Sequence, residues 1–225
     1  MDEKDFCYEY EQVLLERREN YSSELFNKKS REEQDKIAIQ FLKAVFEKYF
    51  HWTPEQVYHY LNKDIIEKMK LSPIVYYLNF DIEFNINSDC YLIAYKLYPD
   101  YFKISKKELA VITYQRVLDG SATRFPKNFF LGTDGQLRAK ACLVYALNTR
   151  KGFSSIDEIF KFMYEEGLKF LKESKLWDAY YYNYNTSPID FFYDCLSKEM
   201  KEKYKEKYEI YESCYQAKKR GRHYD

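Results

Sequence analysis

Tyr10-Glu-Gln-Val-Leu14 and Tyr114-Gln-Arg-Val-Leu118 are two versions of one pentapeptide, 104 residues apart. Each is followed by a stretch that ends at a phenylalanine, Phe26 in the first case and Phe130 in the second. Farther along, residues 37–72 recur as residues 139–174 at a shift of 102. Self-similarity at a fixed distance indicates a structural unit that is present more than once. The pattern therefore predicts a duplicated fold.

The start signals of helices repeat together with the sequence. A hydroxyl residue followed three positions later by Glu or Gln is a capping box, in which the two side chains satisfy backbone N–H groups at a helix start. These pairs are Ser30 with Glu33, Thr53 with Gln56, Ser105 with Glu108, and Ser155 with Glu158. The helix that begins after Ser105 is expected to end near Asp119-Gly120, because glycine adopts the left-handed cap readily.

These signals predict an all-α protein made of two tandem, diverged helical units of about five short helices each, plus a C-terminal helix. Residues 1–104 form the first unit and residues 105–197 the second. Residues 198–225 form a charged C-terminal helix and a basic tail. Four tyrosines at helical spacing on that helix are expected to pack on the body or on a partner, namely Tyr204, Tyr208, Tyr211 and Tyr215. Chance similarity between amphipathic helices is the alternative to duplication.

The charge is balanced overall but unevenly placed. Lys and Arg total 36, as do Asp and Glu, yet residues 1–100 hold 13 of the former and 19 of the latter. The first unit is therefore acidic and the remainder more basic. A strongly cationic nucleic-acid binder carries a larger excess than this, although a local basic face on the second unit remains open. Only 6 Gly and 5 Pro argue against an all-β chain.

The cysteines and the apolar pattern point to a cytosolic protein. There are five cysteines, none in a C-x-x-C pair, and the first residues are polar and acidic rather than a signal peptide. Reduced, mostly buried thiols are expected. The sequence contains no apolar stretch of about 18 residues, so no membrane span is expected.

Signatures of catalysis are scarce. No glycine-rich phosphate loop occurs, and His51 and His59 lack neighbouring residues at metal-ligand spacing. No local pattern places a base beside a Ser or Cys nucleophile. The sequence therefore predicts a non-enzymatic protein with no cofactor and no metal site, and an enzyme ranks third among the functional hypotheses.

One candidate binding segment is Ala122-Thr-Arg-Phe-Pro-Lys-Asn-Phe-Phe130, with the start of the helix after it. Basic side chains near a helix N-terminus can contact phosphates. The candidate residues are Arg124, Lys127, Arg138 and Lys140. The simpler interpretation is favoured, in which the three phenylalanines of the segment fill the core, Pro126 stiffens the turn and the charges are solvated.

A second candidate is the corner from Trp177 to Pro188, where an Asn-rich turn precedes a Ser-Pro helix start. A helix-turn-helix-like corner could present Tyr181, Asn183 and Asn185 to DNA. An aromatic run of this kind can equally be a corner of the core, and that interpretation is favoured.

Two runs carry a resemblance to a known family. Val117-Leu-Asp-Gly120 with Arg124-Phe-Pro-Lys-Asn-Phe-Phe130 resembles a V-L-x-G…R-F-P-x-x-F-[FW] signature, and Leu171-Lys-Glu-Ser-Lys-Leu176 with Asn185-Thr-Ser-Pro188 resembles L-x-E-x-K-L…F-N-x-S-P. Both are similar to an uncharacterised family of Firmicutes and their mobile elements or prophages, known only as a domain of unknown function. The first half is similar to a diverged copy. The resemblance implies an α-helical, repeat-built, cytosolic protein and no activity.

The leading functional hypothesis is a non-enzymatic binding protein that binds DNA through the more basic second unit and tail. The alternative is a protein-interaction or scaffold role, as a homo-oligomer or as a phage-related modulator of a host protein. Since the two units share caps and apolar pattern but not charge, function is expected where the copies diverge.

Overall fold

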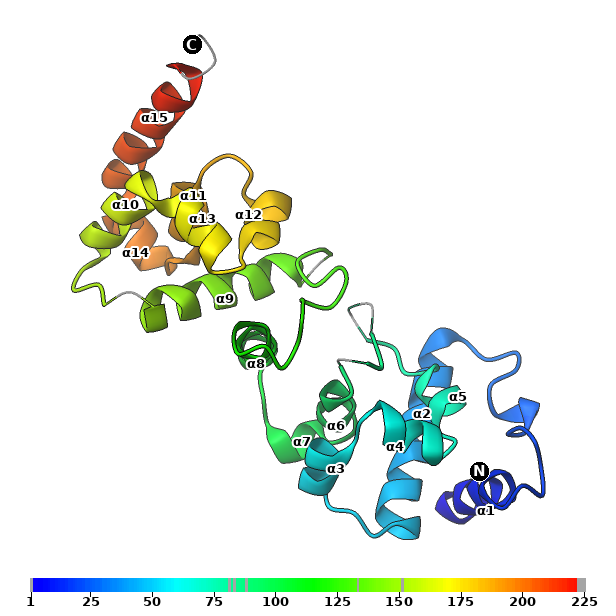
Figure 1. The fold of residues 1–225 in the computed structure, drawn as a ribbon. Helices are drawn as coiled ribbons and strands as arrows, with labels where there is room; N and C mark the ends of the chain where they lie inside the picture. The colour runs from blue at the N-terminus through cyan, green and yellow to red at the C-terminus, as the bar shows by residue number, and fades with distance from the viewer. Residues whose placement is uncertain are drawn as a thin grey trace. The chain divides into compact units, whose positions relative to one another are not determined.

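The computed structural model describes residues 2–80, 82, 84–87, 89–132, 134–150 and 152–221. Within these residues every regular element is a helix, which confirms the predicted all-α class. The chain divides into two units, Met1–Ile104 and Ser105–Asp225, drawn in blue to green and in green to red in Figure 1. The C-terminal helix belongs to the second unit.

The first unit is built around α2 (Arg31–Ala44), which continues into a π-helical turn, η2 (Val45–Tyr49). Phe41, Leu42 and Phe46 of this continuous helix are fully buried. The other elements are α1 (Glu3–Leu14), the 3₁₀ turn η1 (Ser23–Leu25), α3 (Pro54–Tyr60), α4 (Lys63–Lys68), α5 (Ser72–Val75), α6 (Tyr91–Leu97) and α7 (Pro99–Phe102). Because α1, α5 and α6 all pack on α2, their apolar faces are removed from water together.

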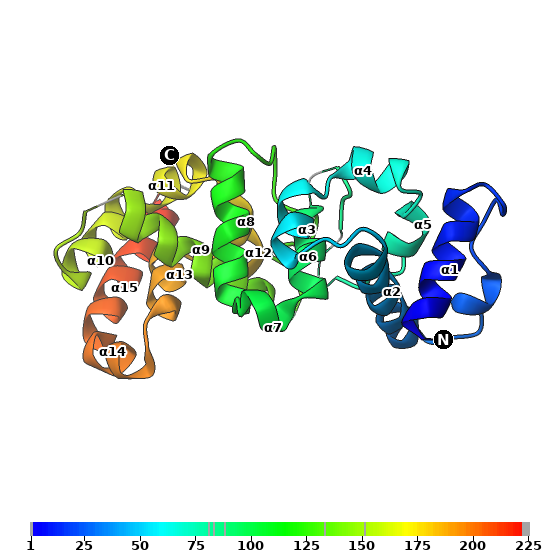
Figure 2. The same ribbon diagram turned by 90° about the horizontal axis from the view of Figure 1, so that it is seen from below.

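In the second unit, α9 (Gly135–Arg150) has the central position. Figure 1 and Figure 2 show α8 on one side of α9, with α12 and α13 on the other. Ala139, Leu143 and Ala146 of α9 are fully buried between them. The other helices are α8 (Lys106–Leu118), α10 (Ile156–Glu165), α11 (Gly167–Glu173), α12 (Trp177–Asn183), α13 (Pro188–Cys195), α14 (Lys198–Lys203) and α15 (Lys205–Gly221).

Most of the predicted helix starts are confirmed. Ser30, Thr53 and Ser105 each cap a helix in a complete capping box. The helix after Ser105 ends at Leu118, and Gly120 follows with a φ of +84°, as expected for a helix terminus. At α10 the box is incomplete. Ser155 accepts from the backbone N–H of Glu158, but the Glu158 carboxylate accepts from Ser154 instead.

The tyrosine stripe of α15 packs on the body of the second unit. The Tyr211 ring stacks over Phe160 at 6.1 Å between centroids, and the Tyr208 ring stacks on Tyr193 at 4.0 Å. Polar contacts join the same surfaces, since Ser187 donates to Glu212 and Gln216 donates to the carbonyl of Thr186. The basic tail falls partly outside the described residues. Residues 218–220 continue α15, whereas residues 222–225 are not described.

Each unit fastens its first helix by the same contact. Lys70 lies in the left-handed region at φ +55°, and its Nζ donates to the carbonyl of Val13 near the end of α1 at 3.3 Å. Lys175 lies at φ +56°, and its Nζ donates to Val117 near the end of α8 at 2.7 Å. A cation at the C-terminal carbonyls of a helix satisfies groups that have no partner within the helix. We call this contact between a lysine and the end of the first helix the lysine latch. It fixes α1 and α8 within their units.

These contacts correct the register that the sequence suggested. Residues 37–72 were matched to residues 139–174 at a shift of 102, which would align Lys70 with Lys172. The latch instead aligns Lys70 with Lys175, a shift of 105. Burial along the central helices fits a shift of 101, since the buried positions 38, 41, 42, 45 and 46 of the first unit correspond to 139, 142, 143, 146 and 147 of the second. Helical periodicity alone tolerates such slips.

A matched pair of substitutions tests how the two first helices are held. Tyr114 is fully buried and its hydroxyl donates to the carbonyl of Ser174 at 2.7 Å, whereas the equally buried Tyr10 hydroxyl has no hydrogen-bond partner among the described residues. Tyr114→Phe should lower the free energy of unfolding of its unit by about 1–2 kcal/mol, and Tyr10→Phe should change it by less than about 0.5 kcal/mol.

The two tryptophans of the chain, Trp52 and Trp177, allow each unit to be followed separately by fluorescence. Urea unfolding of Tyr114→Phe is measured in a Trp52→Phe background, and that of Tyr10→Phe in a Trp177→Phe background. Equal losses in the two variants would show that the Tyr114 hydrogen bond does not stabilise its unit.

Candidate functional site

The connection between α8 and α9 carries the first candidate segment, and its phenylalanines belong to the core. The Phe125 ring stacks on Tyr114 at 5.9 Å and on Phe129 at 5.2 Å between centroids. Phe129 and Phe130 are buried. Adding a Cβ to Gly135 would bring it within 2.5 Å of the Phe130 backbone, so the loop lies directly against the start of α9. The prediction that these rings fill the core is confirmed.

Two of the predicted site residues hold this loop in place. Arg138, on α9, is buried and donates to the carbonyls of Phe129 and Leu131. Asn183, at the end of α12, donates to the carbonyl of Phe130 between them at 2.9 Å. Three consecutive carbonyls thus accept from two side chains on different helices. The Arg138 guanidinium and the Asn183 amide are committed to this clamp, so both residues support the surface from inside.

Lys140 is also engaged within the unit. Its Nζ lies 2.7 Å from the carboxylate of Asp194 on α13, which Lys201 and the Tyr184 hydroxyl also approach, at 2.5 and 2.7 Å. Partial burial by itself would raise the pKa of Asp194, but the hydrogen bonds from Lys140, Lys201 and Tyr184 outweigh it and lower this pKa to about 2. The carboxylate therefore stays ionised and joins α9, α13 and α14.

The other four predicted residues, Arg124, Lys127, Tyr181 and Asn185, are exposed. Arg124 and Lys127 lie on the clamped loop, while Tyr181 projects from α12 with 53% of its surface exposed. Because Asn183 bonds the loop at Phe130, these exposed groups come from two segments that meet. We call Arg124, Lys127, Tyr181, Tyr182 and Asn185 the aromatic–basic surface.

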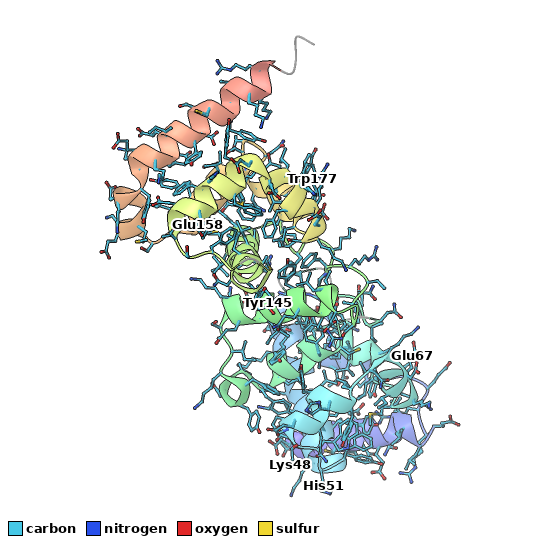
Figure 3. All side chains as sticks on the ribbon, turned by 60° about the vertical axis from the view of Figure 1, so that its left-hand side comes forward. Lys48, His51, Glu67, Tyr145, Glu158 and Trp177 are labelled. Atoms are coloured by element: carbon cyan, nitrogen blue, oxygen red, sulfur yellow. The ribbon has the colours of Figure 1, made fainter. Side chains whose placement is uncertain are left out.

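Sequence reasoning missed two exposed aromatic residues of α12. Tyr182 is 54% exposed, and its ring meets that of Tyr181 edge-on at 5.5 Å between centroids. Trp177, labelled in Figure 3, is 36% exposed, and the Lys172 ammonium lies over its ring at 4.7 Å from the centroid. A helical wheel carries the only available signal. Trp177 and Tyr181 are four residues apart, so they lie on one face of α12, and both are exposed.

The packing of α13 does not favour the helix-turn-helix interpretation of the α12–α13 corner. A recognition helix must be free to enter a DNA groove. Here α13 packs against α9, α10 and α15, and its residues Ile189, Phe191 and Phe192 are buried. Ser187, which caps α13, is itself buried. The corner belongs to the core, as the favoured interpretation predicted, and only its outer residues reach solvent.

Three of the five thiols, those of Cys90, Cys142 and Cys195, are held in the protonated form by burial, whereas Cys214 is exposed. Burial raises the pKa of Cys195 and of Cys90 to about 12, and it raises the pKa of the buried Cys142 as well. In the described part of the chain, no group of three or more His, Cys, Asp or Glu side chains is placed to hold a metal ion. Among the same residues, no helix is long and apolar enough to span a bilayer.

Comparison with known proteins gives one match. Residues 110–201 match the family described as "Protein of unknown function (DUF4046)". The matched segment runs from α8 into α14 and includes both the clamped loop and the α12–α13 corner. The expected similarity to an uncharacterised domain is confirmed for this part of the chain. No curated protein and no solved structure matches the chain.

The role of Asp194 can be tested through its pH dependence. Since the folded-state pKa of Asp194 lies below its ordinary value of 3.8, its contribution to stability is present above about pH 4 and is lost as the pH falls towards 2. Asp194→Asn should lower the free energy of unfolding near neutral pH by about 2 kcal/mol and should flatten the acid limb of the stability curve.

Urea unfolding at a series of pH values measures both effects, with Trp177 fluorescence as the signal. Asp178→Asn, on the exposed side of α12, serves as the control and should leave the curve unchanged. An acid limb that is as steep in Asp194→Asn as in the parent protein would contradict the prediction.

Proposed function

We propose that the protein is a non-enzymatic DNA-binding protein whose second unit contacts single-stranded DNA. The observation that carries the proposal is that the exposed rings of Tyr181 and Tyr182 and the exposed cations Arg124 and Lys127 lie on two segments joined by the hydrogen bond from Asn183 to Phe130. Stacking of unpaired bases on aromatic rings, combined with cationic contacts to phosphates, is the common mode of binding single strands without sequence preference.

The rigidity of the surface supports this proposal. Arg138 and Asn183 clamp the loop at three carbonyls, and Phe125, Phe129 and Phe130 anchor it from below. A loop fixed before binding loses little conformational entropy when it meets a ligand. The cations are therefore presented without the cost of ordering a mobile segment.

Two features favour a single strand over a duplex as the ligand. The buried position of α13 removes the helix that a groove-reading corner would use. In a duplex the faces of the bases are already stacked, so exposed tyrosine rings have no base to contact, whereas an unpaired strand offers every base face.

The two units support one further part of the proposal, that they are diverged copies. They share the lysine latch, the left-handed lysine before a short helix and the order of their helices. The origin of the chain in Firmicutes or their mobile elements stays a prediction from its motifs.

Exposed apolar side chains favour a second candidate, a protein-interaction role. Leu131 is 39% exposed beside the clamp, and Tyr181, Tyr182 and Trp177 add ring surface. Tyrosine and tryptophan are enriched at protein interfaces. A scaffold or homo-oligomer would use the same surface, and light scattering would then give a mass above the 27.5 kDa of one chain.

Substitutions on the aromatic–basic surface test the DNA proposal. Tyr181→Ala should weaken binding of a fluorescent oligothymidylate by about 1–3 kcal/mol, because one base loses its stacking partner. Replacing Arg124 and Lys127 by Gln should reduce the slope of log affinity against log salt by about 0.7 for each cation removed. Fluorescence anisotropy at several salt concentrations measures both quantities.

Lys161→Gln and Tyr8→Ala are the matched controls, since Lys161 is exposed on α10 and Tyr8 is 56% exposed on α1. Neither should change the affinity. Absence of any complex at low salt would refute the DNA proposal, and a mass corresponding to a dimer, lost in Tyr181→Ala, would favour the scaffold role.

A further inference from the structure

The first unit carries an aromatic pair that matches the one on α12. Directly after α5, Tyr76 is 75% exposed, more than any other large apolar or aromatic side chain among the described residues. Its ring meets the Tyr77 ring edge-on at 5.5 Å, the same separation as between Tyr181 and Tyr182. The latch aligns Lys70 with Lys175, and the same shift of 105 aligns Tyr76 with Tyr181.

One ring of the pair, Tyr77, packs against the core of the unit, and the other, Tyr76, is exposed to solvent. Tyr77 stacks on the buried Phe26 at 3.7 Å between centroids with nearly parallel planes. Phe26 corresponds to Phe130 of the clamped loop at the shift of 104 found in the opening pentapeptides. The exposed Tyr76 ring therefore sits against an anchored neighbour, and an exposed ring is suited to stacking.

A cation, Arg31, lies at the tyrosine pair although the first unit as a whole is acidic. Nη2 of Arg31 donates to the carbonyls of Tyr76 and Leu78 at 3.4 and 3.3 Å, which brings the guanidinium to the tyrosine pair. Lys28 is exposed on the loop that precedes Arg31, and the Lys29 ammonium is tied to the carbonyl of Glu24. The arrangement resembles the aromatic–basic surface, although the cations come from different positions.

Two of the carboxylates in the same segment have hydrogen-bond or ion-pair partners within the unit. Glu33 accepts from the backbone N–H of Ser30 in the capping box, and hydrogen bonds from Ser30 lower the pKa of Glu33. Asp35 pairs with Lys96 at 3.0 Å. Glu32 remains exposed on the first turn of α2. Contacts at this position should therefore depend on stacking more than on charge.

We infer that Tyr76, together with Arg31 at its backbone and the exposed Lys28, is a second contact site for single-stranded DNA. The ring stacks on an unpaired base, and the two cations lie near the adjoining phosphates. This inference rests on the proposed function of the second unit. With one such site in each unit, a long strand is held at two points, and a second contact made within the same complex raises affinity through its effective concentration.

Oligonucleotide length separates the two sites. A strand of about 10 nucleotides is on the scale of one site, and one of about 40 can reach both. For the longer strand, Tyr76→Ala should weaken binding about tenfold, while the affinity of the tighter site for the shorter strand stays within about twofold of the parent value. Replacing Lys28 and Arg31 by Gln should produce a smaller loss with the longer strand. Anisotropy titrations with oligothymidylates of both lengths provide the measurement.

The matched control is Tyr101→Ala, a 51% exposed tyrosine on α7 of the same unit, which should bind both strands as the parent does. Circular dichroism checks that Tyr76→Ala is folded. If Tyr181→Ala weakens binding of the longer strand but Tyr76→Ala does not, the second site is refuted while the proposed function stands. If neither protein nor variants bind either strand, the proposed function fails and this inference fails with it.

Discussion

Three consecutive backbone carbonyls in the second unit, those of residues 129–131, determine how its surface is built. Buried carbonyls need donors, and here the donors are a guanidinium from α9 and an amide from α12. Removing Arg138 would take the donor from the carbonyls of Phe129 and Leu131, and the bond to Phe129 is buried. The clamp thereby fixes the loop between α8 and α9, and with it the positions of Arg124 and Lys127. A residue type expected at a phosphate contact is instead used to hold the loop.

Some features are common to the folds of both units, whereas their net charge differs. Both units need a lysine that reaches the end of the first helix and a left-handed residue that turns the chain before a short helix. Each feature uses a single lysine and does not depend on the net charge of the unit, so the first unit can be acidic and the second more basic. An exposed tyrosine lies six positions after each of these lysines, Tyr76 after Lys70 and Tyr181 after Lys175. This tyrosine contributes little to packing in either unit. Its presence in both is the reason to consider function there.

Prediction from sequence succeeded where the signal is local. A capping box involves four consecutive residues, so Ser30, Thr53 and Ser105 could be assigned without tertiary information. It failed at the register between the units, since apolar residues at helical spacing can be matched at neighbouring shifts. Sequence reasoning also failed to separate the exposed from the buried residues among the site candidates. Arg124 and Arg138 look equivalent in a sequence, yet one is exposed and the other buried.

The sequence by itself determined the helical class, most helix starts and the uneven charge, because all of these follow from neighbouring residues and composition. Only the tertiary structure decided which polar groups are exposed and which are committed to contacts within the unit. Lys140 forms an ion pair with Asp194, 54 positions away, and Asn183 donates a hydrogen bond to the carbonyl of Phe130, 53 positions away. Such pairings depend on which helices pack together, and burial energetics, rather than local sequence, selects that packing.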